Sequence, residues 1–479
     1  MNPHRSAWRI VPALLLCLGC QDDPVAAAEF RACSAEESPR ELLRIEDATG
    51  NYRVFDLIDA VSVAAPYYGD VVVVDNCGGE PLRLNKTYGL SSGAAYLGGE
   101  VVLCSSRSAL EGPGVWEILM HGGRGKELGL GEYCVDGPDS SFGFVTTDEG
   151  VVQYLPDGSS RKVPALSGAS LTWLGDAGVV RGRDGLAVLP PGNAEAILVD
   201  GLPPVEFVVT QGNASSWVFL AAYSEPFFPP ELGFPMLFAL DLETGAWFET
   251  TEVTGDRLKT RNSVSVEAGL AAIVDIGLTL WRPEWAGPLP ANVQNVRGVT
   301  VVDGERVVVA TDDGLQLLRV PLERPEDEDV ELEVVWSRPL ADGAVTATSA
   351  GVPWKDVLLV EGTEDVWAYP LDGSEPYPFL PSLGYQESFF PTLGYTHLGT
   401  EYVTAMARNP TDRDDFWLYR NRLGGDVEVL DTDILGAPPE NTSGFISEER
   451  YRWTADLGRI LYAVRDGNTV SIRQHVLTD

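Results

Sequence analysis

Residues 307–318 read VVVATDDGLQLL, which is the pattern of a β-hairpin. Apolar residues dominate both arms, and Asp-Gly stands where the chain has to reverse. Glycine after aspartate supplies the positive φ that a tight hairpin turn needs. The stretch therefore predicts two antiparallel strands joined by a short turn.

The same pattern returns along most of the chain. Close copies lie at residues 144–154, 183–189 and 460–472, and looser copies lie at 357–369 and 403–419. The 50 Gly and 33 Pro interrupt every stretch that would otherwise favour a helix. Hairpins repeated at roughly 35- to 55-residue spacing are typical of a propeller. We predict an all-β chain with a β-propeller over residues 41–479, of eight blades or alternatively seven, whose N-terminal part at 41–135 contains cysteines.

Strand-like sequences lie near both ends of this predicted domain. Val470 to Val476 is the last of them, and Arg53 to Leu57 is the first. We predict that these two segments pair, because closing a ring of sheets removes exposed sheet edges.

Two segments resemble the repeats of known propeller families. Residues 237–247, LFALDLETGAW, resemble the repeat of quinoprotein-type (PQQ-like) propellers, with Asp241 and the Thr-Gly turn at Gly245 in place and Trp247 expected between blades. Residues 71–84, VVVVDNCGGEPLRL, resemble the repeat of TolB-type propellers. These resemblances imply the fold alone. The adjacent cysteines of quinone enzymes are missing from the sequence, so we expect no cofactor.

The N-terminus has the parts of an export signal. Met1 to Arg9 carries two Arg and no acid, Ile10 to Gly19 is apolar, and the small residue Gly19 precedes Cys20. Ten helical residues reach about 15 Å, half of a bilayer core, so the segment is too short to span a membrane. We predict a signal peptide at residues 1–19.

Leu18-Gly19-Cys20 resembles the end of a bacterial lipoprotein signal, in which the residue after the cut is the lipidated cysteine. The resemblance implies that Cys20 carries lipid, palmitate included, and that a flexible tether at 20–40 joins this anchor to the propeller. Gln21 after the anchor implies the outer membrane of the cell envelope, by resemblance to bacterial lipoprotein sorting. The alternative is an ordinary signal peptide cut near Ala26 to Ala28.

The charge of the chain limits its partners. Asp and Glu number 71 against 34 Lys and Arg, a formal net charge of −37. Such a surface repels nucleic acid phosphates and anionic lipid heads, so we expect no nucleic acid partner and attachment to the membrane through lipid alone. A hydrophobic content of 44% is normal for a folded chain.

Four cysteines remain after the signal and the anchor: Cys33, Cys77, Cys104 and Cys134. An even number in an oxidising compartment favours two disulfide bonds, with three pairings open. The sequence contains no C-x-x-C spacing of the kind that would favour a zinc site.

Candidate catalytic groups are few. Residues 89–93, GLSSG, match the nucleophile elbow G-x-S-x-G, which needs a helix after the serine. The following AAYLGG is too short and too rich in glycine for a helix, so we expect a turn between blades. His121, His397 and His475 are isolated, and we expect His475 to be structural.

Acidic residues leave two further alternatives open. Glu326 to Asp329, and the group Asp412, Asp414 and Asp415, are candidate calcium ligands, but neither has the alternating order of a dedicated loop. We expect solvated loops and no metal site. A pair of carboxylates elsewhere remains an alternative for glycan chemistry.

Aromatic residues gather in proline-rich segments at 226–235 and 377–395. Proline blocks ladder hydrogen bonds, which favours loops at the ends of the sheets. Such aromatic residues either pack down on the domain or form a binding patch. The candidate partner-binding residues are Phe227, Phe228, Tyr385, Phe389 and Phe390.

We therefore expect a membrane-anchored envelope lipoprotein whose β-propeller is a binding or assembly platform for protein partners, and not an enzyme. The alternative is a glycan-active hydrolase or lyase that uses carboxylates in the central funnel.

Overall fold

The computed structural model describes the strands between Arg40 and Val476 and some of the turns between them. Residues 1–39, 224–234, 253–263, 342–349, 382–395, 435–450 and 477–479, with shorter stretches between strands, lie outside the described part. Every regular element that is described is a β-strand, which confirms the all-β prediction. The described residues contain no helix that could cross a membrane.

The first four sheets each contain four strands that are consecutive in the chain. They are β2 (Tyr52–Ile58), β3 (Val61–Pro66), β4 (Asp70–Asp75) and β5 (Leu82–Thr87); β6 (Ser91–Leu97), β7 (Glu100–Ser105), β8 (Gly114–Leu119) and β9 (Lys126–Gly129); β10 (Tyr133–Asp136), β11 (Gly143–Thr147), β12 (Gly150–Tyr154) and β13 (Ser160–Lys162); and β14 (Ser170–Leu174), β15 (Ala177–Gly182), β16 (Gly185–Leu189) and β17 (Ile197–Val199).

The next four sheets continue this arrangement, and one of them gains a short parallel strand, β19. They are β18 (Val205–Val208), β20 (Trp217–Tyr223), β21 (Pro235–Asp241) and β22 (Trp247–Glu252); β19 (Thr210–Gln211), β23 (Val264–Glu267), β24 (Leu270–Val274), β25 (Leu278–Trp281) and β26 (Leu289–Ala291); β27 (Gly298–Asp303), β28 (Arg306–Thr311), β29 (Gly314–Arg319) and β30 (Glu333–Arg338); and β31 (Val352–Trp354), β32 (Val357–Glu361), β33 (Asp365–Pro370) and β34 (Tyr377–Pro381).

The last sheet has eight strands and pairs the first described strand with the last one. It contains β1 (Arg40–Ile45), β35 (Thr396–Leu398), β36 (Val403–Arg408), β37 (Phe416–Asn421), β38 (Glu428–Ile434), β39 (Tyr451–Thr454), β40 (Arg459–Asp466) and β41 (Thr469–Val476). The described strands thus form nine sheets, so neither the predicted eight blades nor the alternative of seven is confirmed.

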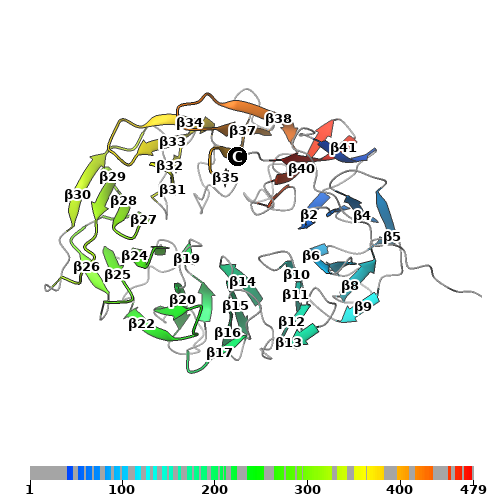
Figure 1. The fold of residues 1–479 in the computed structure, drawn as a ribbon, viewed down its shortest axis with the longest axis horizontal. Helices are drawn as coiled ribbons and strands as arrows, with labels where there is room; N and C mark the ends of the chain where they lie inside the picture. The colour runs from blue at the N-terminus through cyan, green and yellow to red at the C-terminus, as the bar shows by residue number, and fades with distance from the viewer. Residues whose placement is uncertain are drawn as a thin grey trace, which may run out of the picture.

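The sheets follow one another in chain order around a ring (Figure 1). In sheets such as β6–β9 and β27–β30 the first strand lies toward the centre and the last lies at the outside (Figure 1). Within a sheet the consecutive strands run antiparallel. This arrangement is propeller-like.

The predicted hairpins are present. Residues 307–318 form β28 and β29, with Thr311 opposite Gly314. The copies at 144–154 and 460–472 form β11–β12 and β40–β41. Gly314 has a φ of 135°, which a side chain rarely adopts. The Asp-Gly signal therefore marked the turns for the expected physical reason.

The C-terminal strand β41 pairs with a different strand from the one predicted. It pairs antiparallel with β1, with Ile45 opposite Val470, whereas Arg53 to Leu57 belong to β2, which pairs with β3. Leu43 of β1 is buried in one cluster with Ile472 and with Val72 of the first sheet. The predicted pairing was wrong because β2 is the first strand of its own sheet. The preceding strand, β1, completes the last sheet instead.

The core lies between neighbouring sheets. Each described hydrophobic cluster joins two sheets that are consecutive around the ring, including the last and the first. Trp247, Trp336 and Trp354 add hydrogen bonds across these interfaces, donating from the indole nitrogen to the carbonyl oxygens of Asp200, Leu371 and Gly399 at 2.9, 3.1 and 2.8 Å. Trp247 therefore lies between sheets, as its repeat predicted.

The turn before Trp247 is held by its aspartate. Asp241 accepts a hydrogen bond from the backbone amide of Glu243 at 3.1 Å and another from the hydroxyl of Thr244 at 2.5 Å. Gly245 has a φ of 71°, which closes the turn without strain.

The outermost strands carry a repeated irregularity. The pairing of the third strand with the outer one shifts register in five sheets, at β4–β5, β8–β9, β21–β22, β29–β30 and β33–β34. Such β-bulges discourage another strand from pairing with a sheet edge. The repeated bulge therefore favours recognition at the ends of the sheets over recognition along their outer edges.

Candidate functional site

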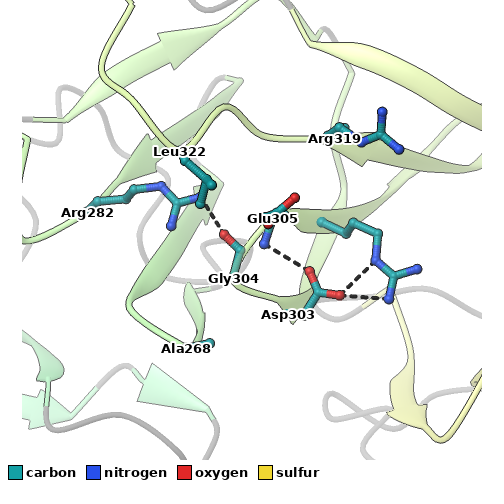
Figure 2. A pocket seen from close by; sticks show the side chains of 8 residues that line it. Ala268, Arg282, Asp303, Gly304, Glu305, Arg319 and Leu322 are labelled. Atoms are coloured by element: carbon teal, nitrogen blue, oxygen red, sulfur yellow. Dashed lines mark hydrogen bonds and ion pairs between the residues drawn. The ribbon is translucent and has the colours of Figure 1, made fainter.

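A hollow of about 550 Å³ lies at one end of two neighbouring sheets, β23–β26 and β27–β30. It is lined by the turn between β23 and β24, the turn between β27 and β28, and the residues that follow β25 and β29 (Figure 2). Three arginines line it, Arg282, Arg306 and Arg319, and we call it the arginine hollow.

The two turns have local causes. Ala268 and Gly269, between β23 and β24, have φ angles of 48° and 76°, as tight hairpins require. Between β27 and β28, the Asp303 carboxylate accepts a hydrogen bond from the backbone amide of Glu305 at 2.9 Å. Aspartate stabilises turns in this way because its short side chain reaches the amide two residues on.

Asp303 is also tied to Arg306. Its Oδ2 lies 2.7 Å from both Nε and Nη2 of that guanidinium. Burial raises the pKa of Asp303, but the hydrogen bonds from Arg306 and from the Glu305 amide outweigh burial, so the pKa lies below its usual value. Asp303 is therefore ionised at neutral pH and already neutralised by Arg306.

The rim of the hollow combines charge with an apolar side chain. Arg319 donates to Glu333 across the β29–β30 pair at 2.8 Å, and both side chains are more than half exposed. Leu322, just after β29, is 62% exposed. A large apolar side chain is thus presented to solvent beside charged groups.

Arg282 differs from the other two arginines because it is buried, with 5% of its surface exposed. Its guanidinium donates to the carbonyl of Gly304 (Figure 2) and lies 5.7 Å from the ring centre of Trp285. Its Nε has no acceptor, and no carboxylate of the described residues forms an ion pair with it. Burial lowers the pKa of Arg282, while Glu284 and Glu305 act in the opposite direction.

A second polar cluster lies in the eight-stranded sheet. Asp431 of β38, 10% exposed at its side chain, accepts from the Tyr462 hydroxyl at 2.6 Å and from Nη1 of Arg473 at 2.9 and 3.0 Å. Burial and the bond to Asp431 raise the pKa of Tyr462. Because Tyr462 is fully buried, this cluster ties β38 to β40 and β41 from within the sheet.

His475 of β41 is 7% exposed, in agreement with its predicted structural role. Burial, helped by Arg420, lowers its pKa to about 4, although Asp431 opposes the shift. The imidazole is therefore neutral at pH 7.

The predicted site residues are mostly outside the described residues. This holds for Cys20, Cys33 and Cys77, and for the aromatic candidates Phe227, Phe228, Tyr385, Phe389 and Phe390. The backbone of Cys104 lies in β7 and that of Cys134 in β10, two strands in contact between neighbouring sheets.

The serine motif does not form a nucleophile elbow. Ser91 begins strand β6, which runs to Leu97, so the helix that the motif requires is replaced by a strand. In the strands and turns that the structure describes, no three His, Cys, Asp or Glu side chains gather as metal ligands. The acidic segments 326–329 and 412–415 lie outside these residues.

The sequence contained a signal for one part of the arginine hollow. Residues 301–309, VVDGERVVV, repeat the Asp-Gly hairpin pattern and mark the turn at Asp303. Nothing in the sequence marks Arg282, because its burial depends on Gly304 in the next sheet.

Comparison with known proteins adds no family. No family model matches the chain, and no curated protein matches it. Among solved structures, an oligogalacturonate lyase in complex with manganese is 9% identical, with 92% of this chain and 98% of that chain covered and a TM-score of 0.36. The tricorn protease is 10% identical, with 85% and 46% covered and a TM-score of 0.31.

YCF48 bound to D1 peptide is likewise 10% identical, with 59% of this chain and 96% of that chain covered and a TM-score of 0.27. Similarities this low say nothing about activity. The propeller-like arrangement rests on the sheets of this chain itself.

Proposed function

We propose that this chain is an outer-membrane lipoprotein, anchored through lipid on Cys20, whose β-propeller is a binding platform for protein partners in the cell envelope. The observation that carries the binding role is the arginine hollow, where the buried guanidinium of Arg282 and the exposed Leu322 line one concave surface. Concave sites that combine apolar side chains with a few polar groups are typical of ligand recognition.

The ion pairs of the hollow favour binding over catalysis. A glycan-active enzyme needs a carboxyl that holds a proton and a second one opposite it. In the hollow, Asp303 is paired with Arg306 and has a lowered pKa, which suits neither donation of a proton nor pairing with another carboxyl. The repeated bulges on the outer strands also favour partner binding at the ends of the sheets over binding along their outer edges.

The aromatic residues predicted to bind a partner offer a test of the platform function. We expect that alanine at Phe227, Phe228, Tyr385, Phe389 or Phe390 weakens partner binding by about 1–2 kcal/mol wherever the ring anchors a partner, while the melting temperature stays unchanged. Where a ring supports the core instead, its removal lowers the free energy of unfolding by about 3–5 kcal/mol. A pull-down from envelope extract and a thermal melt of each variant measure the two quantities.

The matched control is Phe238→Ala. Phe238 lies in β21 with 2% of its surface exposed, so its loss should destabilise the domain. If all five aromatic variants melt early, as this control should, the loops are part of the core and the platform loses its predicted binding residues.

The anchor is tested at Cys20. We expect Cys20→Ser to move the protein from the membrane fraction to the soluble fraction, because lipid is the hydrophobic attachment we propose. Detergent-phase partitioning measures the shift against the wild-type protein. A Cys20→Ser protein that stays with the membranes would contradict lipidation at this residue.

A further inference from the structure

The starting point is the burial of a charge without a counter-charge. Arg282 is 5% exposed, yet its one hydrogen bond goes to the neutral carbonyl of Gly304, and its Nε has no acceptor. Buried charges are normally paired, because leaving water is costly for an ion. A guanidinium stays charged under these conditions, so the cost is not relieved by loss of a proton.

The neighbouring acids do not supply the missing charge. Asp303 is engaged by Arg306, and Glu333 is engaged by Arg319. Glu305 and Glu284 act on Arg282 through space but form no ion pair with it. The arginine hollow therefore contains a guanidinium whose natural partner, a carboxylate or another anion, is not supplied by the described residues.

The shape and charge of the molecule limit what this anion can be. A volume of about 550 Å³ is within the range of small-ligand sites, so more than a single ion fits. Leu322 presents an apolar side chain at the rim. The net charge of −37 repels polyanions, so one carboxylate on an otherwise neutral or basic chain is favoured over an acidic polysaccharide or a phosphate-rich ligand.

We propose that the arginine hollow binds the C-terminal carboxylate of a partner peptide that ends in an apolar residue, with Arg282 as the recognition group and Leu322 as the apolar contact. The proposal rests on the platform function and names the part of the partner that is recognised. The planar guanidinium suits a carboxylate because it offers parallel donors to two oxygens. Capture of a peptide terminus by fixed donors is a known mode of peptide recognition.

The probe is the peptide acetyl-Lys-Ala-Leu, prepared with a free C-terminal carboxylate and as the C-terminal amide. We expect saturable binding of the acid by calorimetry, and binding of the amide about 10- to 100-fold weaker, the range for a hydrogen bond to a charged group. Equal binding of the two forms, or no binding of the acid up to about 10 mM, would overturn the proposal.

Two variants locate the site. Arg282→Lys keeps the charge but loses the paired donors, so the acid should bind about 10-fold more weakly. Leu322→Ser is an exposed change that leaves folding intact and should weaken binding about 3- to 10-fold. The matched control is Leu198→Ser, which alters another exposed leucine, 50% exposed in β17, and should not change binding. Loss of binding in Leu198→Ser equal to that in Leu322→Ser would place the peptide elsewhere.

The outcomes separate this proposal from the platform itself. If the peptide acid fails to bind while the wild-type protein still captures an envelope partner through its aromatic loops, the platform stands and the hollow is not its peptide site. If the peptide binds with the expected preference but no partner is captured, the hollow is a carboxylate site and the platform role is wrong.

Discussion

Replacing Gly314 with alanine should lower the free energy of unfolding by at least about 3 kcal/mol, because the change adds a backbone strain and a clash. Gly314 has a φ of 135° at the turn between β28 and β29. A Cβ on this residue would lie 2.1 Å from the carbonyl oxygen of Arg338 and 2.9 Å from the Cα of Pro339. Both contacts are with backbone, so no side chain can rotate away, and β29 and β30 would have to separate.

Gly269→Ala is the control that isolates the strain from the clash. Gly269 also has a positive φ, 76°, but nothing lies within 4 Å of the position of its Cβ. We expect a cost of about 1–2 kcal/mol, the penalty for a side chain in the left-handed region. Chemical denaturation of both variants measures the difference, and equal losses would show that the crowding around Gly314 relaxes without cost.

Replacing Asp431 with alanine should lower the free energy of unfolding by about 3 kcal/mol, because the buried Tyr462 hydroxyl and the partly exposed Arg473 guanidinium lose their acceptor. Tyr462 is fully buried, and the Arg473 guanidinium, whose Nη1 donates to both carboxylate oxygens of Asp431, would remain charged without that partner. Arg473 lies in β41, the strand that pairs with β1, so we expect the loss of stability to affect the β1–β41 pairing first. Hydrogen exchange of the β1 and β41 amides should therefore rise before that of the other sheets.

The control for this ion pair is Glu333→Ala. Glu333 pairs with Arg319 at 2.8 Å, close to the 2.9 Å of the Arg473–Asp431 pair. The side chains of both Glu333 and Arg319 are exposed. Exposed pairs contribute only about 0–1 kcal/mol because water and salt screen them. Denaturation curves of the two variants should therefore differ clearly, and similar losses would mean that the burial of Asp431 does not strengthen its interactions.

Local turn chemistry explains which parts of the fold were predictable. The turn between β28 and β29 comprises Thr311 to Gly314 and depends on nothing outside these residues. Its positive φ is one that glycine adopts without strain, so the hairpin could be predicted from the sequence. The same holds for the Asp241 turn, whose hydrogen bonds span three residues or fewer. The residues after the G-x-S-x-G segment favour no helix, and none follows it, but the expected turn between blades was wrong because Ser91 begins strand β6.

Local patterns could not predict the number of sheets or the pairing of β1 with β41. Arg40 to Ile45 and Arg53 to Leu57 are both strand-like, and nothing within either segment tells which one pairs with β41. The choice depends on the burial of Leu42 and Leu43 against strands more than 400 residues away in the chain.

The all-β class and the positions of the hairpin turns could be predicted from local sequence, because they depend on the backbone conformations of a few neighbouring residues. The completion of the last sheet by β1 and the burial of Arg282 without a counter-charge are visible in the folded protein alone. Those features arise where two sheets meet, and the neighbours that bury a side chain there come from distant parts of the chain.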